Sequence, residues 1–170
     1  MKIVNTSLLA LALLASPLLA SAETLTTQDY AEIEQLYARY NHAIDSVNAE
    51  AWADTFTADG VFNARFTGRE QLMGFIKTWK ERMNGGNRRH WNSNLSITGS
   101  PEGANGAVYL MLWDVGVKPQ AIVSTGMYAD TLVKTPNGWR FKTRVVKGDA
   151  APAVAPAAAP TPAPAPAPAK

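Results

Sequence analysis

The sequence predicts an α+β domain in which a curved antiparallel sheet is covered on one face by helices. The first observation is that, between Thr27 and Trp79, apolar residues recur every three or four positions, which is the period of a helix. The second is that the period becomes two from Arg88 onward, which indicates strands. Only short turns separate these later segments, so consecutive strands are expected to pair as an antiparallel meander.

A long helix is expected first, because Thr26 or Thr27 can cap its N-terminus with a side-chain oxygen. Its apolar stripe consists of Ile33, Leu36, Tyr37, Tyr40 and Ile44. Asp45 follows this stripe in the last turn, where the helix dipole disfavours an acidic side chain. Helix propensity therefore does not explain why an aspartate stands there.

Three shorter elements follow. Asn48 caps a short helix expected to run through Trp52 and Phe56, and the turn Asp59-Gly60 leads into a strand over Val61–Phe66. Gly68 precedes a third helix that ends at Asn84-Gly85-Gly86. The apolar side of this third helix is Leu72, Phe75, Ile76 and Trp79.

Four long segments rich in β-branched and aromatic residues complete the domain: Arg88–Thr98, Ala107–Val117, Ala121–Lys134 and Trp139–Lys147. Strict alternation in the first of them places His90 on one face with Asn92, Asn94 and Ser96, and it places Trp91, Leu95 and Ile97 on the other. Such a polar row either lines a wet pocket or faces solvent, and alternation alone allows both.

The two ends of the chain are expected to lie outside this domain. Residues 1–22 combine Lys2, the apolar run Leu8–Leu14 and the small residues Ala20-Ser21-Ala22, as in a secretory signal peptide. Residues 150–170 are almost entirely Ala and Pro and are expected to form a disordered tail. The domain thus spans residues 23–149, in a periplasmic or secreted protein that does not bind a membrane after signal cleavage.

Composition excludes several functions. The absence of cysteine excludes cysteine nucleophiles and thiolate metal sites, and the two histidines form no metal-ligand spacing with the scattered acids. The basic residues Lys77, Lys80, Arg82, Arg88 and Arg89 lack interleaved exposed aromatics, so a nucleic-acid interface is not expected. We therefore expect no metal, no cofactor and no nucleic-acid partner.

Acid–base chemistry remains, and Asp45 and His90 are the candidates for it. A neutral imidazole can take up a proton near neutral pH, and a carboxylate beside it fixes the tautomer and stabilises the imidazolium. Two other roles stay open: Asp45 can merely cap the turn after the helix, and His90 can be an exposed strand residue.

The order helix, helix, strand, helix, four strands resembles the cone-shaped superfamily named after nuclear transport factor 2. The finer pattern resembles its SnoaL-like branch, which contains scytalone dehydratase and hexachlorocyclohexane dehydrochlorinase. The matching stretches are Tyr37–Asp45, Trp52–Phe62, His90–Ile97, Gly126–Asp130 and Gly138–Arg144. The resemblance implies a cone-shaped curved antiparallel sheet covered by three N-terminal helices.

The resemblance also implies roles for individual residues. His90 is placed as the base that removes a substrate proton, and Asp45 as the group that orients it. Arg144 matches a pocket arginine that holds an anionic leaving group or a carboxylate. Tyr40 stands where the dehydrochlorinase has a lysine, and it offers a hydroxyl instead. The candidate substrate contacts are therefore Tyr40, Trp52, Tyr128 and Arg144.

These expectations describe a secreted lyase, of dehydratase or dehydrohalogenase type, that acts on a small hydrophobic substrate and forms a homo-oligomer, most simply a dimer. The rival interpretation is a non-catalytic module that binds a small ligand or mediates dimerisation, because one fold can support all of these functions.

Overall fold

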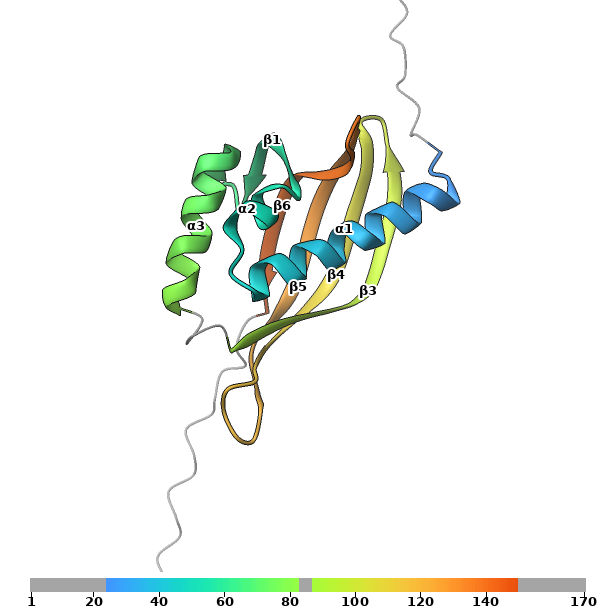
Figure 1. Ribbon diagram of the computed structural model, residues 1–170. Helices are drawn as coiled ribbons and strands as arrows, with labels where there is room; N and C mark the ends of the chain where they lie inside the picture. The colour runs from blue at the N-terminus through green and yellow to red at the C-terminus, as the bar shows by residue number, and fades with distance from the viewer. Residues whose placement is uncertain (1–23, 83–86, 150–170) are drawn as a thin grey trace, which may run out of the picture.

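The computed structural model describes residues 24–82 and 87–149, which form three helices and six strands (Figure 1). The strands make one curved sheet in the order β2-β1-β6-β5-β4-β3. The helix α1 lies across this sheet, and α3 lies beside β1. The predicted α+β class is confirmed. The expected signal peptide (residues 1–22) and tail (residues 150–170) lie outside the described residues.

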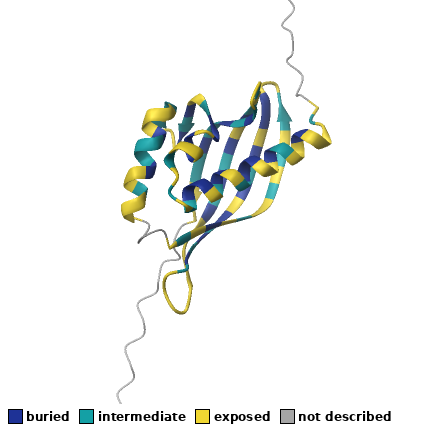
Figure 2. Cartoon of the chain, viewed as in Figure 1, coloured by how far each residue is buried: buried dark blue, intermediate teal, exposed yellow. Residues whose placement is uncertain are grey.

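Helix α1 spans Thr27–Asp45 and begins at the predicted cap, Thr26. The Thr26 hydroxyl accepts a hydrogen bond from the backbone N–H of Asp29, and the Asp29 carboxylate accepts one from the backbone N–H of Thr26. This reciprocal arrangement satisfies two backbone donors that the helix itself leaves free. The predicted apolar stripe of α1 is buried and faces the sheet (Figure 2).

Asp29 also ties the start of α1 to the far end of the sheet. Its Oδ1 accepts hydrogen bonds from Lys134 Nζ at 2.6 Å and from Trp139 Nε1 at 3.0 Å. The Lys134 ammonium, helped by hydrogen bonds from Thr26 and Trp139, holds the pKa of Asp29 well below its usual range. The ionised carboxylate therefore stabilises the folded state.

We expect Asp29→Asn to lower the free energy of unfolding at pH 7 by about 1–3 kcal/mol, because it removes a charged cap and its buried hydrogen bonds. Since the folded pKa is lowered, this contribution is present above about pH 4 and is lost as the pH falls further. Urea denaturation at pH 7 and pH 3 measures both effects. Glu34→Gln, an exposed change on the same helix, is the control, and equal losses in the two variants would contradict the assignment.

The segment after α1 differs from the sequence prediction. Helix α2 spans only Ala49–Ala53, and Phe56 begins strand β1 (Phe56–Phe62) instead of ending the helix. The Phe56 side chain is buried against Tyr40 and Trp52, so its tertiary contacts decide its conformation. A turn then leads to the short strand β2 (Phe66–Thr67) and to α3 (Gly68–Arg82).

The last four strands form the predicted meander, in which each strand pairs antiparallel with the next. They are β3 (Arg88–Ser100), β4 (Gly103–Asp114), β5 (Ala121–Thr135) and β6 (Gly138–Gly148). Strand β1 pairs parallel with β6. Strand β4 begins earlier than predicted because Gly103 adopts a φ of 143°, which lets Ser100 and Gly103 pair across a two-residue turn.

A bulge in β3 corrects the predicted orientation of its side chains. The pairing with β4 shifts by one residue between Ser93 and Ser96, and Asn94 has a φ of 56°. The extra residue reverses the alternation. Leu95 and Ile97 therefore pack against the core on the same face as His90, and Trp91 lies on the opposite, exposed face.

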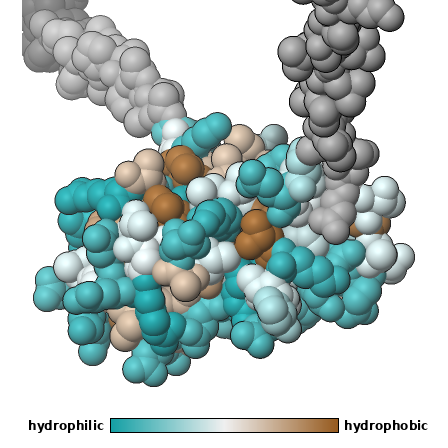
Figure 3. All heavy atoms as spheres, turned by 90° about the horizontal axis from the view of Figure 1, so that it is seen from above, coloured by the Kyte–Doolittle hydropathy of each residue, from teal (hydrophilic) through white to brown (hydrophobic). Residues whose placement is uncertain are grey.

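The two faces of the sheet have different environments. The inner face and the helices enclose a core that includes Tyr40, Trp52, Tyr128 and Phe141. The outer face carries Trp91 and Tyr109, each 55% exposed, and Trp91 packs against Trp113. Seen from above, the surface is mainly hydrophilic with a few separate apolar spots (Figure 3).

Candidate active site

The structure brings Asp45 and His90 into direct contact at the point where α1 ends and β3 begins. Oδ1 of Asp45 lies 2.6 Å from Nδ1 of His90. Both carboxylate oxygens also accept the backbone N–H of His90, at 3.1 and 3.2 Å. Asp45 therefore holds both the backbone and the ring of His90, and the His90 side chain is only 4% exposed. A solvent-exposed His90 is excluded.

This contact assigns the tautomer of the neutral imidazole. A carboxylate accepts hydrogen bonds, so the proton of the neutral ring resides on Nδ1 and the lone pair on Nε2 is left available. Among the described residues, Nε2 has no hydrogen-bond partner in the structure. His90 thus has the orientation of a general base whose second nitrogen is fixed by a carboxylate.

His90 lines a cavity of about 240 Å³ between the helices and the inner face of the sheet. Most of its wall is apolar or aromatic, and the polar side chains on it are few. The lining residues are Tyr40, Ile44, Phe62, Asn63, Phe75, Trp79, Arg82, His90, Leu110, Leu112, Ser124, Tyr128 and Val146. Asp45 is not among them, and it lines a separate groove that His90 also lines. His90 is therefore the residue shared by the groove of Asp45 and the cavity.

Tyr40 and Tyr128 contribute two phenols to the cavity wall. Their rings meet edge to face at 5.8 Å, and each side chain is at most 1% exposed. Burial raises the pKa of both hydroxyls, so they stay protonated and act as donors. The Tyr40 hydroxyl is inaccessible to solvent and makes no hydrogen bond of good geometry with any described residue, although Tyr128 and Trp52 lie close enough to lower its pKa. The two phenols are therefore buried donors next to the cavity and next to each other.

Arg144 lies behind these tyrosines, where it is fully buried. Its Nε and Nη2 donate to the Asp130 carboxylate at 2.8 and 2.7 Å, and Tyr37 donates to the same carboxylate. The guanidinium also lies over the rings of Tyr40 and Tyr128, at 4.2 and 4.1 Å from their centroids. Burial by itself lowers the pKa of Arg144, but Asp130 raises it above the ordinary value. Arg144 is therefore a permanent cation with a carboxylate partner.

Of the four candidate substrate contacts, Tyr40 and Tyr128 line the cavity with His90. Trp52 and Arg144 do not line it. Trp52 is fully buried in the core, with its ring 5.5 Å from that of Tyr40. The structure thus brings together one imidazole, its carboxylate partner and two phenols.

Ser124 and Asn63 on the wall were not singled out from the sequence. For Ser124 a signal existed, because alternation along β5 places it on the same face as Tyr128. Asn63 follows β1 and accepts the backbone N–H of Val146, an arrangement that depends on the parallel pairing of β1 with β6. Local sequence does not reveal such a pairing.

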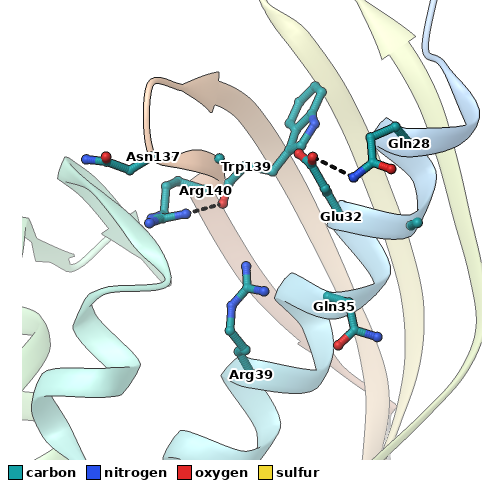
Figure 4. Close-up of a pocket in the computed structure, with 9 residues that line it drawn as sticks. Gln28, Glu32, Gln35, Arg39, Asn137, Trp139 and Arg140 are labelled. Atoms are coloured by element: carbon teal, nitrogen blue, oxygen red, sulfur yellow. Dashed lines mark hydrogen bonds between the residues drawn. The ribbon is translucent and has the colours of Figure 1, made fainter.

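A second hollow, of about 400 Å³, lies near the start of α1 and the β5–β6 turn (Figure 4). Polar side chains line most of it, including Glu32, Arg39 and Arg140. Glu32 accepts a hydrogen bond from Gln28, and Arg140 donates to the carbonyl of Trp139. None of the residues that the sequence predicts for the site lines this groove, so it is separate from the His90 cavity.

The described residues meet the requirements of neither a metal site nor a membrane-spanning helix. Within residues 24–82 and 87–149, no group of three His, Asp or Glu side chains is arranged to hold a metal ion. In the same part of the chain, no helix is long and apolar enough to cross a membrane.

The curved sheet, the covering helices and the interior cavity define a cone-shaped α+β domain. The sequence model of the SnoaL-like domain matches residues 26–145, and the chain belongs to this family. No curated protein matches the chain.

Solved structures agree with this assignment. A protein of unknown function with a cystatin-like fold from Nostoc punctiforme is 24% identical, with a TM-score of 0.67 over 75% of this chain and 96% of that one. A Catenulispora acidiphila protein in complex with S-DNPA is 28% identical, with a TM-score of 0.61 over 72% and 95% of the two chains. A putative scytalone dehydratase from Novosphingobium aromaticivorans is 26% identical, with a TM-score of 0.58 over 72% and 85%.

Proposed function

We propose that the protein is a cofactor-independent lyase, of dehydratase or dehydrohalogenase type, that acts on a small hydrophobic molecule. The observation that carries this proposal is the 2.6 Å contact between Asp45 and Nδ1 of His90, with the imidazole on the wall of an apolar cavity. The similarity to a putative scytalone dehydratase supports the reaction class, and the S-DNPA complex of another relative supports a small-molecule ligand.

The reaction begins with Nε2 of His90, which takes a proton from a carbon atom next to a substrate carbonyl. The electron pair of the broken C–H bond forms a carbon–carbon double bond while the bond to the leaving group breaks. A hydroxide leaving group accepts the proton from the imidazolium and leaves as water. A halide leaves as the anion, and the imidazolium then releases its proton to solvent. Asp45 stabilises the imidazolium in between, and the low dielectric of the cavity strengthens this interaction.

The tyrosine hydroxyls supply the second element of the mechanism. Negative charge develops on the carbonyl oxygen as the proton leaves, and a donor placed there stabilises that charge. Tyr40 and Tyr128 line the cavity, and their hydroxyls remain protonated. We assign them to bind this oxygen.

A panel of one- and two-ring β-hydroxy ketones and β-halo ketones tests the proposal. Absorbance of the conjugated product reports elimination, and deuterium uptake from D₂O by the saturated ketones reports proton removal alone. We expect at least one compound to react with the wild-type protein and not with His90→Gln. Binding without elimination or exchange across the panel would favour the non-catalytic interpretation.

The exposed outer face of the sheet favours an additional property, the formation of a homodimer through this face. Large exposed apolar patches on soluble proteins mark interaction surfaces, and two-fold homodimers are the commonest assemblies. Here Trp91, Tyr109, Ile122 and Val123 are each between 47% and 55% exposed.

We expect size-exclusion chromatography with light scattering to find the wild-type protein as a dimer and the double variant Trp91→Glu, Tyr109→Glu as a monomer. Burying two carboxylates at an apolar interface is strongly unfavourable. Tyr30→Glu changes another exposed aromatic residue, on α1, and should leave the dimer intact. A monomeric wild-type protein would contradict the proposal.

A further inference from the structure

The wall of the His90 cavity has an unusual charge distribution. Its described lining residues include Arg82 and His90 but no aspartate or glutamate. Two carboxylates near this wall are already engaged, since Asp45 binds His90 and Asp130 binds Arg144. Within the part of the chain that the structure describes, the wall is therefore mostly apolar, and Arg82 is its one permanent cation.

The position of Arg82 on α3 directs it to this cavity. Phe75, Trp79 and Arg82 recur at helical spacing and all line the cavity, so they share one face of α3. The Trp79 ring stacks on Phe75 at 5.7 Å and lies 6.2 Å from the ring of His90. Arg82 continues this row toward solvent. It is the last residue of α3 and is exposed.

A basic residue in the last turn also interacts favourably with the helix dipole, and this effect alone can account for an arginine there. The helix dipole does not explain, however, why this arginine lies on the wall of the cavity. Arg69, Arg88 and Arg144 each pair with a carboxylate, whereas no described carboxylate pairs with Arg82. A guanidinium that no described carboxylate pairs with, on the wall of an apolar cavity, is suited to a ligand carboxylate.

We propose that the cavity selects small aromatic or alicyclic carboxylates. The carboxylate binds Arg82 at the solvent side, and the ring system packs against Trp79, Leu110 and Leu112. This inference rests on the proposed function, because it assumes that the same cavity binds the substrate. It adds the chemical class of that substrate. Such an anion does not contact Asp45, because Asp45 does not line the cavity.

The test compares 2-naphthoate with 2-naphthamide, which share a ring system and differ in charge. Binding is measured by calorimetry and by NMR of the Trp79 indole N–H, assigned with Trp79→Phe. We expect the wild-type protein to bind naphthoate about tenfold more tightly than naphthamide. Arg82→Gln should remove this preference, and Arg82→Lys should keep part of it. Lys80→Gln is the matched control, because Lys80 is exposed on α3 and does not line the cavity.

Three results would overturn the inference: an unchanged preference in Arg82→Gln, binding of naphthoate that leaves the Trp79 signal unmoved, or no binding of naphthoate at millimolar concentration. The measurement needs no turnover, so it is independent of the lyase proposal. His90→Gln should keep the carboxylate preference. If the protein turns over substrate but does not prefer carboxylates, the inference about Arg82 is wrong and the lyase proposal stands. If it prefers carboxylates but shows no turnover, the lyase proposal is wrong and the inference about Arg82 stands.

Discussion

Replacement of His90 by Gln is expected to lower kcat/KM by about two to four orders of magnitude, which is the usual effect of losing a general base. Gln has a similar size and can still donate to Asp45, but it has no lone pair that takes up a proton near neutral pH. The backbone N–H of residue 90 keeps its hydrogen bonds to the Asp45 carboxylate. We therefore expect a folded and inactive variant.

Asp45→Asn should produce a loss similar in size, because an amide can hold the imidazole with either nitrogen protonated and does not stabilise the imidazolium. The two losses should not add in the double variant, since His90 without Asp45 is already disabled. Nitrogen-15 NMR of the His90 ring reports the same change without substrate: Nδ1 carries the proton in the wild type, and Asp45→Asn should relax this preference.

His42→Gln is the matched control for both variants. His42 lies one turn before Asp45 on α1, is exposed, and does not line the cavity. Its replacement should change neither kcat/KM nor the tautomer of His90. Additive losses in Asp45→Asn and His90→Gln, or full activity in either, would show that the two residues do not act as an acid–base unit.

The sequence predicts much of this site because local patterns determine its framework. Helical spacing places Asp45 at the end of α1, and the change of period places His90 at the start of β3. The contact between them is not a local property, since 45 residues separate them in the chain. It was implied by resemblance to a family, and the structure supplies its geometry.

Two bulges explain what alternation could not predict. The bulge at Asn94 reverses the faces of β3 after His90, and its signal is a single positive φ. In β5, the pairing with β6 shifts by one residue between Thr131 and Leu132. If the register set at the hairpin turn continued unchanged, Asp130 would pair with Thr143. Because of the shift, Asp130 lies opposite Arg144. A one-residue shift thus creates the buried ion pair.

That ion pair leads to the largest expected effect on stability. Asp130→Asn should lower the free energy of unfolding by about 3–5 kcal/mol, because it leaves the Arg144 guanidinium buried without a compensating charge. For a domain of this size the melting temperature should fall by roughly 10 °C or more. Chemical and thermal denaturation measure the two quantities.

Two comparisons isolate the cause. Asp59→Asn removes a carboxylate from an ion pair with Lys142 on the exposed side of the sheet, and little change is expected there because solvent screens such pairs. The double variant Asp130→Asn, Arg144→Met removes the uncompensated charge as well, so it should recover part of the stability lost in Asp130→Asn.

These variants also distinguish two roles for Arg144. The resemblance to dehydrochlorinases implies that it holds an anionic group of the substrate, whereas its geometry makes it the partner of Asp130 behind Tyr40 and Tyr128. If the geometry determines its role, the double variant keeps carboxylate binding at Arg82 once it is folded. If instead Asp130→Asn changes stability by less than about 1 kcal/mol and the double variant loses ligand binding, Arg144 is the anion site and the ion pair is secondary.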